Sequence, residues 1–215
     1  MMLIKKCTVE LAGTFAMVFV GTGAAVINET TGGSVTQIGI SITFGLIVLI
    51  VILALGHISG SHINPAVTVA LAVNRHFPWS SVFPYIISQL TGAVLASYIL
   101  KLLFPLSVFL GSTLPAGSVL QSFLLEIFLS FLLMFTILVI IQNLSTHKIL
   151  SAVIIGAVVL LEAYFAGPVC GASMNPARSF GPALVSNNLQ HLWIYLTAPF
   201  IGMLLAGGIF KLFIK

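Results

Sequence analysis

The sequence predicts an all-α membrane protein in which six transmembrane helices and two re-entrant half-helices form an inverted repeat. Three observations predict this fold class. Of the 215 residues, 59% are hydrophobic and only 6% are charged, whereas soluble domains carry about a quarter charged residues. The apolar residues fall in runs long enough to cross a bilayer. Two stretches that each contain Asn-Pro-Ala also match one another, although they lie in opposite halves of the chain.

The apolar runs define the spanning helices. A run of about 17–25 residues is needed to cross a hydrocarbon core of about 30 Å. Such runs lie at 7–27, 36–57, 82–103, 118–141, 149–166 and 190–211. The first follows a short basic start, as the core of a signal peptide does, but it is long enough to span and contains Glu10, which a signal core tolerates poorly. We therefore expect six transmembrane helices.

The basic residues are divided unevenly between the two sides of these spans. One side holds Lys5, Lys6, Arg75, Lys148, Lys211 and Lys215. The other side has Lys101 and Arg178 as its cations, together with Glu29. The positive-inside rule therefore predicts a multi-pass protein of the cell membrane with both termini in the cytoplasm. Because the cations sit at span ends and form no stripe, the positive net charge does not indicate nucleic-acid binding.

Two further stretches, 58–81 and 167–189, are too apolar for ordinary loops and are interrupted by glycine and proline. They align as GHISGSHINPAVT and GPVCGASMNPARS, and the starts of the two halves align as ELAGTFAMVF and EIFLSFLLMF. With three spans in each copy, the second copy must enter the membrane from the opposite side. We expect one membrane domain over residues 1–215, with inverted repeats at approximately 1–103 and 118–215.

The Asn-Pro pairs predict where two half-helices begin. Asparagine is favoured at a helix cap and proline at the first turn, so we expect half-helices at 65–74 and 176–186. Their N-termini, each carrying about half a positive charge, should meet near the midplane. A cap asparagine with its oxygen bound to its own half-helix keeps its NH₂ donors for the lumen. A neutral oxygen can accept these hydrogen bonds, while a cation is repelled by the two helix ends.

The paired motifs, the two aligned glutamates and the helix layout resemble the major intrinsic protein family of aquaporins and aquaglyceroporins over essentially the whole chain. The motif residues are Asn64, Pro65, Ala66, Asn175, Pro176 and Ala177. The resemblance implies a passive channel in the lipid bilayer for water and small neutral solutes, with no enzymatic activity and no cofactor. It also implies a homotetramer with one pore in each subunit.

The resemblance assigns further site residues one position at a time. Glu10 and Glu126 match buried acids that accept hydrogen bonds from the re-entrant loops, so we favour this structural role over a proton relay. His62 is expected to line the pore and not to bind a metal. The selectivity filter of the family falls on Phe44, Ala163, Ala172 and Arg178. An arginine inside a membrane is costly, which indicates that Arg178 is functional.

The filter residues indicate a subgroup. Water-selective members carry a histidine where this chain has Ala163, and glycerol facilitators carry two aromatic residues, a glycine and a nearby aspartate that this chain lacks. The stretch AGPVCGASMNPARSFGPAL is similar to nodulin-like intrinsic proteins and their prokaryotic relatives. That similarity implies passage of glycerol, urea and undissociated metalloid acids through an aperture that Phe44, Ala163 and Ala172 leave wide.

Three alternatives stay open at this point. A water-selective channel would share all the motifs. An ion-coupled secondary transporter would also have inverted repeats and broken helices, but it usually carries more intramembrane acids. An intramembrane enzyme would need a nucleophile with a base, or a metal cluster, and no such cluster is visible in the sequence.

Two further residues near the expected filter have no assigned role. Glu162 should point away from the lumen and has no evident partner. Cys170 lies near enough to Ala172 for a mercurial to reach the pore.

Overall fold

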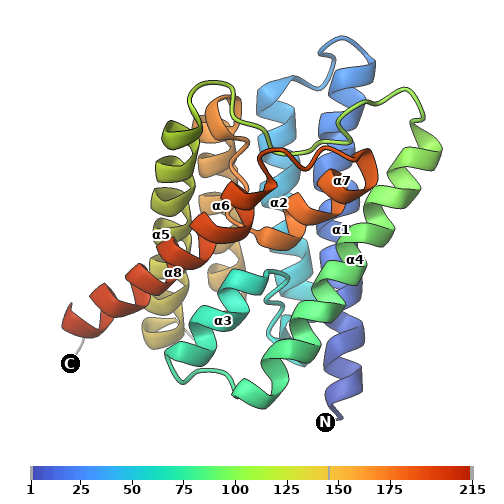
Figure 1. Cartoon of the computed structure of the whole chain (residues 1–215). Coiled ribbons are helices and arrows are strands. Elements are labelled where there is room, and N and C mark those ends of the chain that lie inside the picture. Colours follow the sequence, from blue (N-terminus) through green and yellow to red (C-terminus); the bar gives the residue numbers. More distant parts are fainter. Residues whose placement is uncertain (1, 145, 214–215) are drawn as a thin grey trace.

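The computed structural model of the protein describes residues 2–144 and 146–213 (Figure 1). Residue Lys215, counted above among the cations of one side, lies outside these ranges. Six long helices, each of 22–28 residues, are long and apolar enough to cross a membrane. They are α1 (Leu3–Thr30), α2 (Thr36–Ser59), α4 (Val82–Leu103), α5 (Val119–Asn143), α6 (Lys148–Cys170) and α8 (Leu192–Phe213). The described part of the chain is thus all-helical, and the predicted fold class is confirmed.

Two short helices complete the fold. These are α3 (Pro65–Val73) and α7 (Pro176–Ser186), and a single 3-10 turn, η1 (Trp79–Ser81), leads into α4. Both short helices begin at the prolines that the sequence analysis identified. In Figure 1, α3 and α7 point toward each other from opposite sides of the molecule and meet in its middle, and the two chain ends lie at the same end of the bundle.

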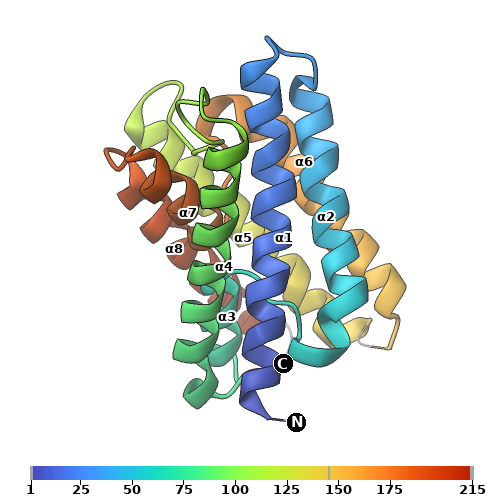
Figure 2. The same ribbon diagram turned by 90° about the vertical axis from the view of Figure 1, so that its right-hand side faces the viewer.

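The helix packing joins the two halves of the chain. Within the first half α1 packs on α2 and α4, and within the second half α5 packs on α6 and α8. Between the halves α2 packs on α6, α4 on α7 and α3 on α8. Figure 2 shows α1 and α2 side by side along the face opposite α8. Each short helix is therefore wedged against a long helix of the other half.

Glycines allow two of these helix pairs to pack closely. A Cβ atom on Gly92 of α4 would collide with the Leu11 carbonyl of α1, and one on Gly202 of α8 would collide with the Ile127 carbonyl of α5. Small residues permit such close backbone approach between transmembrane helices. Because these two glycines lie at matching places in the two halves, the packing of α1 on α4 resembles the packing of α5 on α8.

Helix α6 differs from the sequence prediction. The predicted span ended at residue 166, because Gly167-Pro168 suggested a break. The helix continues through Pro168 to Cys170 and ends at Gly171, which has a left-handed φ of 83°. A proline removes one backbone hydrogen bond, and transmembrane helices accommodate that loss. The matching helix α2 also runs past its predicted end to Ser59 and ends at Gly60. The non-helical segment between each long helix and the short helix that follows it is therefore residues 60–64 in the first half and 171–175 in the second.

Candidate functional site

The two asparagines cap the short helices. Asn64 Oδ1 accepts hydrogen bonds from the backbone N–H groups of Ala66 (2.9 Å) and Val67 (3.4 Å). Asn175 Oδ1 accepts the corresponding bonds from Ala177 (3.0 Å) and Arg178 (3.4 Å). These side chains satisfy helix N-terminal donors that would otherwise lack a partner inside the protein. Each asparagine is therefore held in a fixed orientation with its NH₂ group directed away from its own helix.

The NH₂ groups do not remain entirely free, contrary to expectation. Asn64 Nδ2 donates to the Met174 carbonyl and Asn175 Nδ2 donates to the Ile63 carbonyl, both at 2.8 Å. Each half-helix cap is thus bound to the re-entrant loop of the other half. Asn175 Nδ2 also lies 3.6 Å from the sulfur of Met17. Since an amide NH₂ has two hydrogens, Asn64 keeps one donor for a solute, whereas the second hydrogen of Asn175 is directed at the Met17 sulfur.

The backbone of the two loops adopts an unusual conformation. In the first loop Ser61 and Ile63 have φ angles of 45° and 43°, and in the second loop Ala172 and Met174 have φ angles of 40° and 52°. Left-handed φ values are unfavourable for residues with a Cβ atom. The same residue positions are affected in both loops, so the two loops share one backbone shape. Such strained backbone persists only where surrounding contacts hold it.

Two buried glutamates supply such contacts. Glu10 accepts hydrogen bonds from the backbone N–H groups of His62 (3.0 Å) and Ile63 (2.7 Å). Glu126 accepts the equivalent bonds from Ser173 (2.7 Å) and Met174 (2.8 Å). Both glutamates are fully buried. A carboxylate that accepts backbone N–H bonds makes strong hydrogen bonds, so each glutamate fixes the loop just before its asparagine.

His62 is tied into a polar network beside Glu10. Its Nδ1 atom lies 3.1 Å from Thr68 Oγ1. Thr68 Oγ1 also donates to the Asn64 carbonyl (2.9 Å) and accepts from Gln89 Nε2 (3.0 Å). The hydroxyl hydrogen is already used, so the tautomer that satisfies all three contacts carries its proton on Nδ1. In neutral His62 this tautomer leaves Nε2 as an acceptor.

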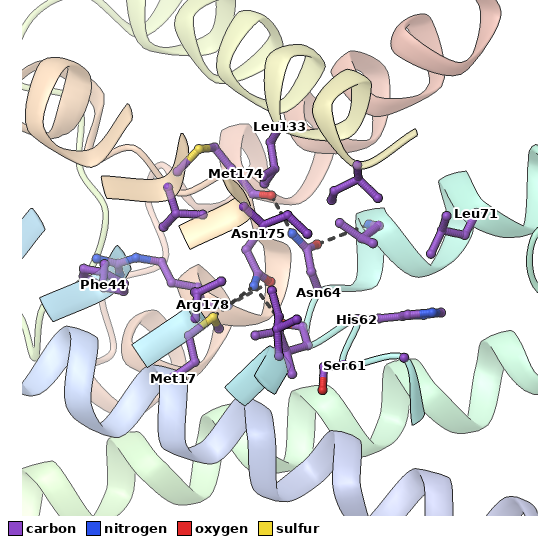
Figure 3. A pocket seen from close by; sticks show the side chains of 18 of the residues that line it. Met17, Phe44, Ser61, His62, Asn64, Leu71, Leu133, Met174, Asn175 and Arg178 are labelled. Carbon is purple, nitrogen blue, oxygen red and sulfur yellow. Dashed lines mark hydrogen bonds between the residues drawn. The ribbon is translucent and has the colours of Figure 1, made fainter. Parts of the chain in front are cut away.

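A cavity of about 390 Å³ runs past both asparagines. All four expected filter residues and His62 line it, together with the loop residues 60–64 and 172–175. Its remaining wall is mostly aliphatic and comes from α2, α5 and α6, including Val48, Leu133, Ile137, Ile155 and Val159. Figure 3 shows Phe44 and Arg178 on one side of the asparagine pair and His62 and Leu71 on the other. The cavity therefore presents polar groups along one strip of an otherwise apolar wall.

Arg178 has two partners that fix its guanidinium at one end of the cavity. Its Nη1 atom donates to the Gly111 carbonyl at 2.7 Å, and its Cζ atom lies 4.9 Å from the centre of the Phe44 ring. The side chain is only 6% exposed. A guanidinium over an aromatic face is electrostatically favourable. The positive charge is thus held at the wall of the cavity that the two alanines of the expected filter, Ala163 and Ala172, also line.

Two residues of the site, Met17 and Gly111, were not predicted from the sequence. Met17 lines the cavity and approaches Asn175 across 158 positions of sequence. Gly111 lies in the long connection between α4 and α5, which folds back over the bundle. No motif marks either residue. The glycine in a connecting segment was the one available hint for Gly111, because its φ of 69° favours glycine.

Glu162 and Cys170 lie outside the cavity lining. Glu162 is 6% exposed, and neither of its carboxylate oxygens has a hydrogen-bond partner among the described residues. Cys170 is fully buried, and its thiol lies 3.5 Å from the Ala166 carbonyl within the same helix. The thiol of Cys170 is therefore not part of the cavity wall.

Comparisons with known proteins agree with this geometry. The family model described as "Major intrinsic protein" matches residues 1–210. "Probable aquaporin NIP4-2" of Arabidopsis thaliana is 44% identical over 97% of this chain and 74% of its own length. "Aquaporin NIP2-1" of Zea mays is 45% identical over 94% of this chain and 68% of its own length.

A solved structure gives the same result for the fold. The X-ray structure of the aquaglyceroporin from Plasmodium falciparum superposes with a TM-score of 0.90, covering 98% of this chain and 96% of that chain at 24% sequence identity. The helix arrangement, the matched family and the curated relatives all lead to the same conclusion. The chain belongs to the major intrinsic protein family, a family of multi-pass membrane channels and not of enzymes.

Proposed function

We propose that this protein is a passive channel for small uncharged solutes, such as glycerol, urea and undissociated metalloid acids, as well as water. The observation that carries the proposal is the composition of the cavity beside Arg178. Two of the four filter positions are alanines, and the aromatic Phe44 lies against the guanidinium. Small side chains leave room for a solute larger than water, while the guanidinium offers fixed donors to hydroxyl groups.

Exclusion of protons and cations is part of the proposal. The N-termini of α3 and α7 both face the cavity at the asparagines, and each contributes partial positive charge. Arg178 adds a full charge at one end. The apolar wall lowers the local dielectric, so these charges are weakly screened. A neutral solute can accept the available N–H donors without this electrostatic penalty.

The test is a transport assay in liposomes that hold the purified protein. Stopped-flow water permeability is compared with uptake of glycerol, urea and arsenous acid for the wild type and for Ala163→His. We expect solute uptake well above that of empty liposomes, and a fall in the variant because an imidazole fills the space beside the guanidinium. Fast water flow with negligible solute uptake in both proteins would replace this proposal with a water-selective channel.

A second assay tests charge exclusion. Arg178→Ala removes the fixed charge and the contact with Phe44, so we expect proton or cation leakage and altered solute selectivity. The control Lys101→Ala removes a cation whose hydrogen bonds, within the described ranges, go to the Pro105 and Ser107 carbonyls of the connecting loop, and it should leave both properties unchanged. Unchanged leakage and selectivity in Arg178→Ala would show that the constriction lies elsewhere.

The assembly and membrane orientation are also proposals. We infer a homotetramer with one pore in each subunit, placed in the cell membrane with both termini in the cytoplasm. The two ends of the described chain lie on one side of the bundle, which is consistent with this arrangement (Figures 1 and 2). Cross-linking in native membranes tests the subunit number, and protease access to a terminal tag in sealed cells tests the orientation.

A further inference from the structure

The Phe44 ring rests directly on the backbone of α1 at Gly21. A Cβ atom built on Gly21 would lie 2.6 Å from Cδ1 of Phe44, 2.8 Å from Cζ, and closer still to the Cε1 atom between them. Real Cβ atoms essentially never approach another heavy atom within 3.0 Å. The distances to Cδ1 and Cζ are similar and only slightly longer than the distance to Cε1. This Cβ atom would therefore lie over the face of the ring, above Cε1, and not beyond its edge. The ring therefore occupies the volume that any side chain at position 21 would need.

The contact is specific to the ring. The three nearest atoms to a Cβ on Gly21 all belong to the Phe44 side chain. At Gly45 and Gly92, by contrast, the nearest atoms include backbone of the neighbouring helix, so those glycines serve helix crossing. Gly23, two residues along α1 from Gly21, has one neighbour, a Leu100 methyl carbon at an ordinary 3.4 Å. The nearest obstacles to a side chain at position 21 are thus atoms of the Phe44 ring of α2, with no backbone of a neighbouring helix among them, unlike those at Gly45 and Gly92.

The Phe44 ring can be displaced in one direction only, toward the cavity. It is 7% exposed, with the α1 backbone on one side and the Arg178 guanidinium carbon 4.9 Å from its centre. Both Phe44 and Arg178 line the cavity. A side chain at position 21 would push the ring away from α1, into the space that it shares with Arg178. Such overpacking forces side chains and backbone to shift.

We propose that Gly21 is a specificity-determining residue that sets the aperture of the filter by allowing Phe44 to lie back against α1. This inference rests on the proposed function, because it takes the cavity beside Arg178 as the solute path. Gly21 does not itself line the cavity. It acts through the position of the aromatic ring, so a single methyl group at position 21 narrows the passage that the alanines at 163 and 172 leave open.

The experiment compares Gly21→Ala with Gly23→Ala, which adds the same methyl group to the same helix where it meets no close contact. Glycerol and water permeability are measured in liposomes for both variants and the wild type. We expect glycerol permeability of Gly21→Ala to fall about tenfold, the effect of a small increase in barrier, and water permeability to fall less. Gly23→Ala should keep the wild-type ratio. An unchanged ratio of glycerol to water in Gly21→Ala would overturn the inference.

A second variant separates the aperture from a folding defect. Phe44→Leu removes the ring, so adding Gly21→Ala to it should change the glycerol-to-water ratio no further. A defect in folding alone would lower both permeabilities in proportion and leave the ratio constant, which counts against the inference. Failure of the proposed function appears in a different measurement, as a wild-type protein without solute uptake. In that case water permeability tests the inference. Gly21→Ala must have a lower water permeability than the wild type, and the double variant must have the same water permeability as Phe44→Leu alone.

Discussion

The two re-entrant loops have the same backbone shape but are held in place by different contacts. In the first half Glu10 accepts four hydrogen bonds, because Ser59 Oγ (2.7 Å) and Gln89 Nε2 (2.8 Å) join the two loop N–H groups. In the second half Glu126 accepts the two bonds from the loop backbone, and no other N–H or O–H group of the described residues donates to it. A fully connected buried network rigidifies its surroundings. The first loop is therefore fixed from within the bundle.

The two helices that flank the second loop, α6 and α7, are held by the connection between α4 and α5. Thr113 Oγ1 lies 2.7 Å from Ser179 Oγ, and the backbone N–H of Ala116 donates to the Val169 carbonyl at 3.0 Å. With the bond from Arg178 to Gly111, three contacts join this connecting segment to α6 and α7. Equivalent backbone geometry can thus be kept by interior side chains in one half and by a connecting segment in the other. Three of the four expected filter residues, Ala163, Ala172 and Arg178, lie in the half that depends on the connecting segment.

The largest expected effect compares the two glutamates. Glu10→Ala leaves four buried donors without an acceptor, whereas Glu126→Ala leaves two, and each unsatisfied donor costs about 1–3 kcal/mol. The two substitutions remove the same atoms from fully buried positions, so the bonds from Ser59 and Gln89 are the main difference in hydrogen bonding between them. We expect the lower thermal unfolding temperature in detergent for Glu10→Ala. Equal losses would mean that these two additional bonds contribute nothing to stability.

An intermediate effect is expected in the connecting segment. In Gly111→Ala the new methyl carbon would lie 2.9 Å from Thr22 Cβ and 3.0 Å from the Thr22 carbonyl oxygen. The backbone at residue 111 must therefore shift, and with it the Gly111 carbonyl that accepts the hydrogen bond from Arg178. We expect a loss of about 1–3 kcal/mol from overpacking, together with altered solute selectivity in the liposome assay. Gly33→Ala is the control, because Gly33 also has a positive φ, of 103°, but no atom within 4 Å. If both variants keep the wild-type selectivity, the segment does not position Arg178.

The smallest effect is expected at Glu162. This buried carboxyl group has no partner among the described residues, and burying such a group is unfavourable. Glu162→Gln keeps the shape of the side chain and removes the possibility of charge. We expect a change in unfolding free energy within about 1 kcal/mol, typical of a substitution that breaks no interaction, with unchanged permeability. A loss as large as that of Glu126→Ala would reveal a partner for Glu162 outside the described residues.

Much of the fold follows from the sequence because its signals are local. Each predicted spanning helix lies within a few residues of an observed one, and the Asn-Pro pairs place the starts of α3 and α7 correctly. The end of α6 was wrong because Gly167-Pro168 resembles a helix break, although the surrounding helices support a continued helix. Local patterns carry helix starts well, but they do not show which prolines the tertiary structure accommodates.

The contacts around the filter could not be predicted in the same way. Gly21 meets Phe44, and Gly111 meets Arg178, only because of how the helices are rotated and where a long connecting segment runs. The filter positions Ala163 and Ala172 were assigned by family resemblance, since an alanine in an apolar run carries no signal of its own. Residues with distinctive chemistry, such as Phe44 and Arg178, could thus be predicted from the sequence. The glycines that determine where those side chains lie, Gly21 and Gly111, could not.

The paired bonds from Asn64 to Met174 and from Asn175 to Ile63 have a consequence for the order of assembly during synthesis. Chains generally fold from the N-terminal end as they are made, and these bonds join residues 110 and 112 positions apart. When the first half-helix has entered the membrane, its acceptor at Met174 has not yet been synthesised. The newly inserted first half must therefore retain water or a temporary partner at Asn64, and the two cap bonds that join the halves at the midplane form only when the second half-helix arrives.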